Sequence, residues 1–371
     1  MLIEFNVAVP ENTPRSADVY ISGNIEELGN WNPVIKLDRI TKNFCSKKID
    51  IPECKIKTTE YKYLLGSWAD SEKGHDNAEI NNRKIKVDEK FRIFDKVNLW
   101  SYSSGRYNTL TGNVRFHYNF YSPQLDNYRT IIIYLPDNYE YEKNRYQVLY
   151  MHDGNNIFDA KTSFSGIEWM VDETVEKLIK MNEIEKIIVV GIYNTSDRIN
   201  EYSPYIDDIR GGGKGDSYIK FIKETLKPFI DKNYRTKCGR DYTGIAGSSL
   251  GGLISLYAVF EYPETFGKAG IISPALYWSD LKIINMIESK NLGYKLKLWI
   301  DIGTDEFEQA GVLKWYENAV EHCEILENAI KNQNKSSDMI DYKFSIIKGG
   351  RHNEYWWSLR TEDVLKYLFK K

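Results

Sequence analysis

The stretch of sequence that decides the fold runs from residue 245 to residue 253 and reads Ile-Ala-Gly-Ser-Ser-Leu-Gly-Gly-Leu. It places the pattern G-x-S-x-G between a short apolar segment and a predicted helix, which is the context that a nucleophile elbow requires. Ser249 fits this pattern, because Gly247 and Gly251 stand two residues to either side and leave room for a sharp turn of the backbone. Ser248 fits worse, since the residues two positions away from it are not glycines. Ser249 is therefore the candidate nucleophile, and the alternative is a glycine-rich turn without chemistry.

Outward from this turn, short apolar runs alternate with helical segments. Apolar runs of this length are typical of strands that are buried on both faces. Strands that alternate with helices predict a mostly parallel sheet with helices on both faces, and two strands, 114–120 and 130–135, precede it. The further predicted strands are residues 148–151, 187–190, 243–246, 269–272, 296–300 and 342–347, and the predicted helices are residues 172–180, 216–230 and 251–260.

Two histidines follow Ser249 in the chain. Hydrolases with such an elbow carry the serine, the acid and the histidine in that order, so one of the two is expected to be the base. His352 lies in a glycine-rich turn after the predicted strand 342–347, where a catalytic base belongs. His322 lies in a strongly helical stretch, 319–329, and is expected to be structural. The sequence therefore predicts His352 as the base.

The acid is expected in the loop after the predicted strand 296–300, which contains Asp305 and Glu306. Either carboxylate could accept the imidazole N–H and hold its tautomer. The other would then be a solvent-exposed group that caps the next helix. The residue pattern alone leaves both assignments open.

An oxyanion hole needs backbone N–H donors that point at the developing negative charge. The first donor is expected from Leu250, at the start of the helix that follows Ser249. The second is expected from the loop after the predicted strand 148–151, at Asn155 or a direct neighbour.

The first hundred residues follow a different pattern, in which Pro, Gly and Asn separate short alternating segments at 3–7, 19–21 and 60–65. Several short strands at this spacing predict an antiparallel β-sandwich. Residues 100–108 are small, polar and without periodicity, as expected of a linker. We therefore predict a β-sandwich over residues 1–100, a linker over 101–111 and the sheet-and-helix domain over 112–371.

The composition restricts the classes of function. A net charge of −3 over 371 residues gives no electrostatic reason to bind nucleic acid or an acidic membrane surface. No stretch approaches the roughly 18 apolar residues that span a bilayer. The sequence has no H-E-x-x-H, P-loop or G-x-G-x-x-G pattern, so neither a metal nor an organic cofactor is predicted. No signal peptide is visible and the four cysteines form no C-x-x-C pair, so we expect free thiols and a cytoplasmic protein.

The N-terminal residues carry a first resemblance. Residues 21–33 read Ile-Ser-Gly-Asn-Ile-Glu-Glu-Leu-Gly-Asn-Trp-Asn-Pro, and Glu-Tyr-Lys-Tyr at 60–63, Trp68 and the pair Asn82-Arg83 follow in order. This series resembles the signature of starch-binding modules, the carbohydrate-binding modules of the family-twenty type, over about the first hundred residues. The insert at 69–79 is longer and more charged than in that family.

This resemblance implies an immunoglobulin-like sandwich that binds glycan. It implies that Trp31 and Trp68 stack against a sugar ring, with Lys62 and Asn82 as hydrogen-bonding partners. For Trp31 the alternative is that the ring packs within the fold.

Several motifs surround the elbow in the second domain. They are Tyr134-Leu135-Pro136 with Tyr139, His152-Asp153-Gly154, Leu226-Lys227-Pro228-Phe229-Ile230, Tyr234-Arg235-Thr236 and Gly350-Arg351-His352. Together they resemble the esterase family of α/β-hydrolases that includes enterochelin esterases, feruloyl and acetyl-xylan esterases, S-formylglutathione hydrolases and mycolyl transferases. The resemblance covers about residues 110–371.

This second resemblance implies an α/β-hydrolase fold with a mostly parallel central sheet and a serine esterase with a Ser-His-Glu triad. In that family the acid usually takes the last place of G-T-x-E/D, which favours Glu306 over Asp305. Arg198, Glu201 and Tyr202 resemble family positions near the substrate entrance, and their alternative role is loop structure.

Three functions then compete. The first is an esterase that removes acyl groups from a carbohydrate, to which the N-terminal module binds. The second is an esterase, thioesterase or acyltransferase that acts on a small non-carbohydrate substrate, such as a siderophore or an S-formylglutathione-like thioester. The third is a glycan-binding protein without catalysis, and the complete set of Ser249, His352 and Glu306 argues against it.

Overall fold

The computed structural model describes residues 1–10, 13–15, 17–74, 80–87, 90–101, 108–306, 318–336 and 338–371. Residues 75–79 of the charged insert and 102–107 of the predicted linker therefore lie outside the described residues. The chain forms two compact units, one of Met1–Thr109 with Asp159–Glu168 and one of Leu110–Phe158 with Trp169–Lys371. Among the described helices, none has the length and apolar character needed to cross a membrane.

The first unit is a β-sandwich of two four-stranded sheets, as the sequence predicts. Phe5, Ile21, Tyr61 and Tyr63 are buried together in its core. One sheet has the order β4 (Asp38–Thr41), β5 (Phe44–Asp50), β1 (Leu2–Ala8) and β9 (Arg92–Lys96), and the other has the order β3 (Ile35–Lys36), β2 (Tyr20–Gly23), β6 (Glu60–Leu64) and β8 (Arg83–Lys84).

The prediction of a wholly antiparallel sandwich is wrong in one place. β9 pairs with β1 in the parallel direction, from Glu4 opposite Arg92 to Ala8 opposite Lys96. The strands β2 to β8 lie between β1 and β9 in the chain, so a crossover separates the two, as parallel pairing requires.

The second unit contains a mixed eight-stranded sheet. Its strand order is β11 (Asn113–Ser122), β12 (Asn127–Leu135), β14 (Ile187–Ile192), β13 (Gln147–Met151), β17 (Thr243–Ser248), β18 (Lys268–Ile272), β19 (Leu296–Gly303) and β20 (Ile340–Ile347). β11 and β12 pair antiparallel and lead into a sheet whose remaining strands are parallel. The carboxyl ends of β17 to β20 therefore meet at one edge of the sheet.

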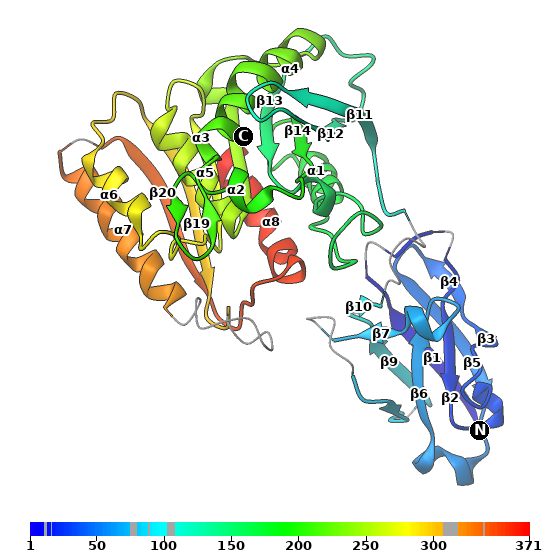
Figure 1. Cartoon of the computed structure of the whole chain (residues 1–371). Helices are drawn as coiled ribbons and strands as arrows, with labels where there is room; N and C mark the ends of the chain where they lie inside the picture. The colour runs from blue at the N-terminus through cyan, green and yellow to red at the C-terminus, as the bar shows by residue number, and fades with distance from the viewer. Residues whose placement is uncertain are drawn as a thin grey trace. The chain divides into compact units, whose positions relative to one another are not determined.

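Helices cover both faces of this sheet (Figure 1), because alternate residues of each strand point to opposite sides. Ile245 lies in the hydrophobic cluster with α3 (Gly215–Lys220), α4 (Lys227–Asn233), α5 (Leu250–Glu261), α6 (Lys282–Ser289) and α7 (Ala319–Ser336). The adjacent Ala246 lies in the cluster with α1 (Val171–Lys180) and α8 (Glu354–Phe369).

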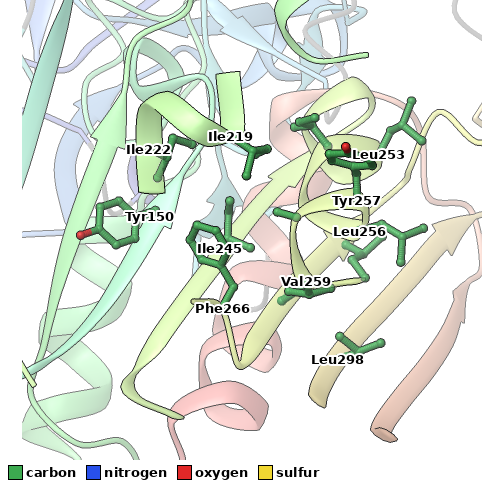
Figure 2. Close-up of a cluster of buried hydrophobic side chains, with 14 of the residues drawn as sticks. Tyr150, Ile219, Ile222, Ile245, Leu253, Leu256, Tyr257, Val259, Phe266 and Leu298 are labelled. Atoms are coloured by element: carbon green, nitrogen blue, oxygen red, sulfur yellow. The ribbon is translucent and has the colours of Figure 1, made fainter. Parts of the chain in front are cut away.

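α5 is the most deeply buried helix of this unit in the part of the chain that is described, with every residue from Leu250 to Phe260 buried. An apolar surface on all sides is expected of a helix enclosed in the core. Figure 2 shows Leu253, Leu256, Tyr257 and Val259 of this helix packed among side chains from the strands. Ser249, at the helix start, is therefore attached to a helix that the core encloses.

The helix predicted over residues 216–230 is present and contains one irregular segment. α3 is followed by a wider π-helical turn, η5 (Phe221–Leu226), and then by α4. Pro228 has no N–H to donate to the preceding turn, although Leu226 and Lys227 already have right-handed helical backbone. A proline inside a continuous helix therefore accounts for the wider turn that precedes it.

Gly247 lies where β17, α5 and the loop after β13 approach one another most closely. A Cβ atom at this position would lie 3.0 Å from the carbonyl carbon of Gly251 and 3.0 Å from Cδ2 of His152. Contacts of this kind require the backbone or a buried ring to move, so only glycine fits without strain.

We therefore expect Gly247→Ala to lower the free energy of unfolding by about 1–3 kcal/mol, measured by urea denaturation. Gly293→Ala is the matched control, because a Cβ atom there would meet nothing within 4 Å, and its effect should stay within about 0.5 kcal/mol. Equal losses in the two variants would contradict this account of the turn.

Candidate active site

Ser249 is the single residue between β17 and α5. Its backbone has φ 58° and ψ −123°, a conformation that costs a residue with a side chain on the order of 1–3 kcal/mol. The surrounding structure holds this conformation, since the Ser249 N–H donates to the carbonyl of Ile272 at 3.1 Å and its carbonyl accepts the N–H of Ala275 at 3.0 Å. Ser249 is partly exposed, whereas Ser248 is only 4 % exposed inside the strand. The strained, accessible serine of the turn is thus Ser249.

His352 lies between β20 and α8 and contacts a carboxylate at the end of β19. Its Nδ1 lies 2.6 Å from Oε2 of Glu306. The other carboxylate oxygen of Glu306 accepts the Gly303 N–H at 2.7 Å and the Ser273 hydroxyl at 2.7 Å. The Asp305 carboxylate accepts instead from the hydroxyl of Thr304 at 2.7 Å. The partner of His352 is therefore Glu306, the acid that the family resemblance favours.

Glu306 is 3 % exposed, so its charge needs compensation. Burial alone raises the pKa of this carboxyl, but the hydrogen bond from His352 and the nearby Arg360 outweigh burial. The net result is a pKa below the usual range of a glutamate, so Glu306 is ionised at neutral pH. An ionised acceptor on Nδ1 leaves Nε2 of the ring as the proton acceptor.

Backbone contacts connect the serine turn to this pair. The Ser249 N–H donates to Ile272, the last residue of β18, and the next residue, Ser273, donates its hydroxyl to Glu306. Ser249, Glu306 and His352 all follow the carboxyl ends of parallel strands within one sheet. The fold therefore brings the three predicted residues to the same edge.

The loop after β13 lies against the serine turn. A Cβ atom on Gly251 would lie 3.4 Å from Cβ of His152, so this loop and the start of α5 are in direct contact. Leu250 is the first residue of α5, and the N–H groups of a first helical turn have no carbonyl partner within the helix. Asn155 lies in the short helix η4 (Gly154–Asn156) and is half-buried. Both predicted oxyanion donors thus belong to segments that touch.

Asp153 fixes the course of this loop. Its backbone is left-handed, with φ 53°, and its N–H donates to the hydroxyl of Tyr202 at 3.0 Å. Its carboxylate accepts two hydrogen bonds from Arg198, at 2.6 and 2.7 Å, and one from Asn194 at 2.7 Å. Burial raises the pKa of Asp153, but Arg198 and the hydrogen bonds lower it further, so the carboxyl stays ionised.

Glu201 anchors the same loop region through a buried ion pair. Its carboxylate accepts hydrogen bonds from Arg129 at 2.9 and 3.0 Å, and both side chains are fully buried. Arg198, Glu201 and Tyr202, which resemble family positions near the substrate entrance, therefore all anchor the loop that follows β14.

Sequence reasoning missed a group of buried polar residues beneath Glu306. They are Ser273 and Asp301 at the ends of β18 and β19, and Trp357 and Arg360 on α8. One signal could have found them, because Arg360 is spaced three and four residues from Trp357 and Val364, so on a helix such as α8 it shares their apolar stripe, where a charge needs a partner.

In the first unit, the two predicted glycan-contacting tryptophans lie together. The ring centroids of Trp31 and Trp68 are 5.8 Å apart, and Nε1 of Trp68 donates to the carbonyl of Trp31 at 2.9 Å. Trp68 is 42 % exposed, whereas Trp31 is half-buried with a left-handed backbone, φ 65°. Lys62 is only 7 % exposed, and Asn82 is exposed and donates its amide to Glu60 at 3.1 Å.

Comparison with known families supports both units. The family model described as "Putative esterase" matches residues 122–367, and the "Starch binding domain" model matches residues 1–97. An uncharacterised protein of Bacillus subtilis, YjcH, is 28% identical over 256 residues, which is 67% of this chain and 95% of that protein. An endo-1,4-beta-xylanase/feruloyl esterase of Xylanibacter ruminicola is 27% identical over 174 residues, 45% of this chain and 22% of that protein.

Solved structures show the same fold. The BES protein of Bacillus cereus matches with a TM-score of 0.58 and 20% identity, over 71% of this chain and 98% of that one. The enterobactin esterase FES of Shigella flexneri matches with a TM-score of 0.54 and 13% identity, over 98% of this chain and 92% of that one.

His152 makes a testable contribution to stability. Its Nδ1 lies 2.9 Å from the hydroxyl of Tyr218, and burial lowers the pKa of the ring from 6.5 to about 3. The unfolded chain therefore binds a proton below pH 6.5 that the folded protein does not bind. The contribution of His152 to the free energy of unfolding is therefore fully present above pH 6.5. It decreases as the pH falls, by at most about 1.4 kcal/mol per pH unit.

Consequently, the free energy of unfolding of the wild type should fall more than that of His152→Asn when the pH decreases from about 7.5 to about 5. The difference should be roughly 2 kcal/mol, measured by urea denaturation at both pH values. Asp172, whose pKa is raised to about 6 by burial, acts in the opposite direction, but it is present in both proteins and cancels in the comparison. The same pH dependence in variant and wild type would show that His152 is not responsible.

Proposed function

The chain belongs to the esterase family of α/β-hydrolases, and on this premise we propose that it is a serine esterase with the triad Ser249, His352 and Glu306. The observation that carries the proposal is the contact between Nδ1 of His352 and the buried, ionised Glu306, at the same sheet edge as the strained turn at Ser249. Burial of an ionised carboxylate costs free energy, and a histidine with only a structural role does not require one as its partner.

The reaction follows from these positions. His352 removes the hydroxyl proton of Ser249 as the serine oxygen attacks the ester carbonyl, and Glu306 stabilises the imidazolium that forms. The N–H groups of Leu250 and of Asn155 or its neighbour stabilise the oxyanion. His352 then returns the proton to the leaving alcohol. Water, activated by the same histidine, releases the acyl group and restores Ser249.

For the substrate we propose acyl groups on a carbohydrate. The match of residues 1–97 to the starch-binding domain supports a glycan as ligand of the first unit. Trp68, with an exposed ring that is fixed by its hydrogen bond to Trp31, suits stacking on a sugar. The feruloyl esterase named above is a relative that acts on an ester, as its name states.

A second candidate is a small ester, such as a siderophore. The enterobactin esterase FES supports it, because its structure matches 98% of this chain, the first unit included. In that case the first unit would have a role other than glycan binding.

We expect Ser249→Ala to reduce hydrolysis of p-nitrophenyl acetate by more than about 10³-fold, because the nucleophile is removed while the fold is kept. Ser248→Ala is the matched control, since Ser248 is adjacent but lies buried in β17, and it should retain most of the activity. Full activity of Ser249→Ala, with circular dichroism unchanged, would refute the proposed nucleophile.

Glycan binding is tested separately on insoluble starch. Trp68→Ala should weaken binding about tenfold, because truncation of a contact aromatic costs on the order of 1–2 kcal/mol. Phe94→Ala is the control, since Phe94 belongs to the same unit and is 65 % exposed. If the wild-type protein does not bind starch while esterase activity persists, the small-ester candidate is favoured.

A further inference from the structure

Arg360 is a buried cation whose hydrogen-bonding groups are only partly satisfied. Its side chain is 4 % exposed and lies on α8, eight residues after His352. Nη1 donates to Oδ1 of Asp301 at 2.6 Å and to the hydroxyl of Ser273 at 2.8 Å. Nε and Nη2 have no hydrogen-bond partner among the described residues. A guanidinium that uses one of its three nitrogens in this way contributes mainly its charge.

That charge lies between two carboxylates. Nη2 of Arg360 is 3.7 Å from Oε1 of Glu306, and Nη1 contacts Asp301 on the other side. Both oxygens of Asp301 accept hydrogen bonds, one from Arg360 and one from Nε1 of Trp299 at 2.6 Å. Burial raises the pKa of Asp301 above the usual value of an aspartate, although both donors lower it. The contact of 2.6 Å with the guanidinium is the ion pair in which this carboxylate keeps its charge.

The same contacts reach the triad by two routes. Ser273 accepts from Arg360 and from Nε1 of Trp357 at 3.2 Å, and it donates its hydroxyl to Glu306. The Trp357 ring also packs edge-on against the ring of His352, with centroids 5.0 Å apart. Arg360 therefore contacts the Ser273 hydroxyl, which Trp357 also holds, and places its charge close to Glu306.

The charges of the cluster do not cancel in the resting enzyme. Asp301 and Glu306 carry two negative charges and Arg360 carries one positive charge, so the buried cluster has a net charge of −1 while His352 is neutral. Conversion of His352 to an imidazolium brings the sum to zero. A low-dielectric site favours the neutral sum, so the charges of the cluster complement the imidazolium that forms when the serine proton is transferred.

Among the described residues around the cluster, no other group changes this sum. Cys323, on α7, lies near both carboxylates, but burial raises the pKa of its thiol, which is therefore neutral. Arg351 and Glu354 flank His352 in the chain, are half-buried and carry opposite charges.

We infer that Arg360 is a positioning residue of the esterase, which, together with Asp301, sets the electrostatic field in which His352 takes up the serine proton. The inference rests on the proposed function. Arg360 touches neither substrate nor reacting atoms and acts through Ser273, Asp301 and Glu306.

The test is the pH dependence of kcat/KM on p-nitrophenyl acetate, measured on the full chain between pH 5 and pH 9. The acid limb of this profile reports protonation of the base. Asp301→Asn removes a negative charge and should move the limb to lower pH, on the order of one pH unit. Arg360→Met removes the positive charge and should move the limb to higher pH by a similar amount, with kcat about 10- to 100-fold lower.

Two further variants separate charge from packing. Arg360→Lys keeps the charge and should leave the limb near its wild-type position, and the double variant Arg360→Met/Asp301→Asn should return it there. If Arg360→Met does not fold, as judged by circular dichroism, Asp301→Asn and the double variant still decide the question. Lys366→Met is the matched control, because it removes a half-buried cation of the same helix that pairs with Glu183 and Glu362, away from the cluster, and should leave the profile unchanged.

The inference would be overturned if the acid limb of the kcat/KM profile stayed in place in Asp301→Asn and Arg360→Met, or moved in the same direction in both. A packing defect lowers activity without shifting the acid limb in opposite directions in the two variants. That result is distinct from failure of the proposed function, which would appear as hydrolysis by Ser249→Ala.

Discussion

The backbone conformation of Ser249 is the constraint on which the rest of the catalytic domain depends. A residue with a side chain at φ 58° and ψ −123° is held there only by its surroundings. Those surroundings are Gly247, which lets β17, α5 and the His152 loop come together, and α5, which is buried from Leu250 to Phe260. The strain therefore fixes the hydroxyl at the edge of the sheet.

Burial of charge is the second constraint. Glu306 and Asp301 are almost completely buried, and a buried carboxylate without partners would take up a proton rather than remain ionised. Glu306 stays ionised because His352, Gly303 and Ser273 supply hydrogen bonds to it. The ionised state of Glu306 thus depends on the donors at the ends of the surrounding strands and next to α8 as much as on the glutamate itself.

Local patterns carried the sequence prediction a long way. The elbow, the alternation of strands and helices and the turn that holds His352 are each visible in consecutive residues, so they could be predicted. The choice between Asp305 and Glu306, one residue apart, depended on family resemblance, because only the folded loop shows which side chain turns inward. The contacts of Arg360 could not be predicted, since its partners come from β18 and β19, about 60 to 90 residues earlier in the chain. The parallel pairing of β1 with β9 is non-local in the same way.

Two arginine–aspartate pairs support the site, and their different burial gives them different physical roles. Arg198 pairs with Asp153 beneath the expected oxyanion loop, with 28 % of the arginine side chain exposed, whereas Arg360 pairs with Asp301 at 4 % exposure. Water screens the first pair more strongly than the second. Arg198 also belongs to the loop after β14 and thus to the side where substrate is expected to enter, so a bound substrate can change its environment. The second pair is shielded from both water and substrate. Of the two pairs, Arg360–Asp301 therefore exerts the stronger electrostatic effect on its neighbours.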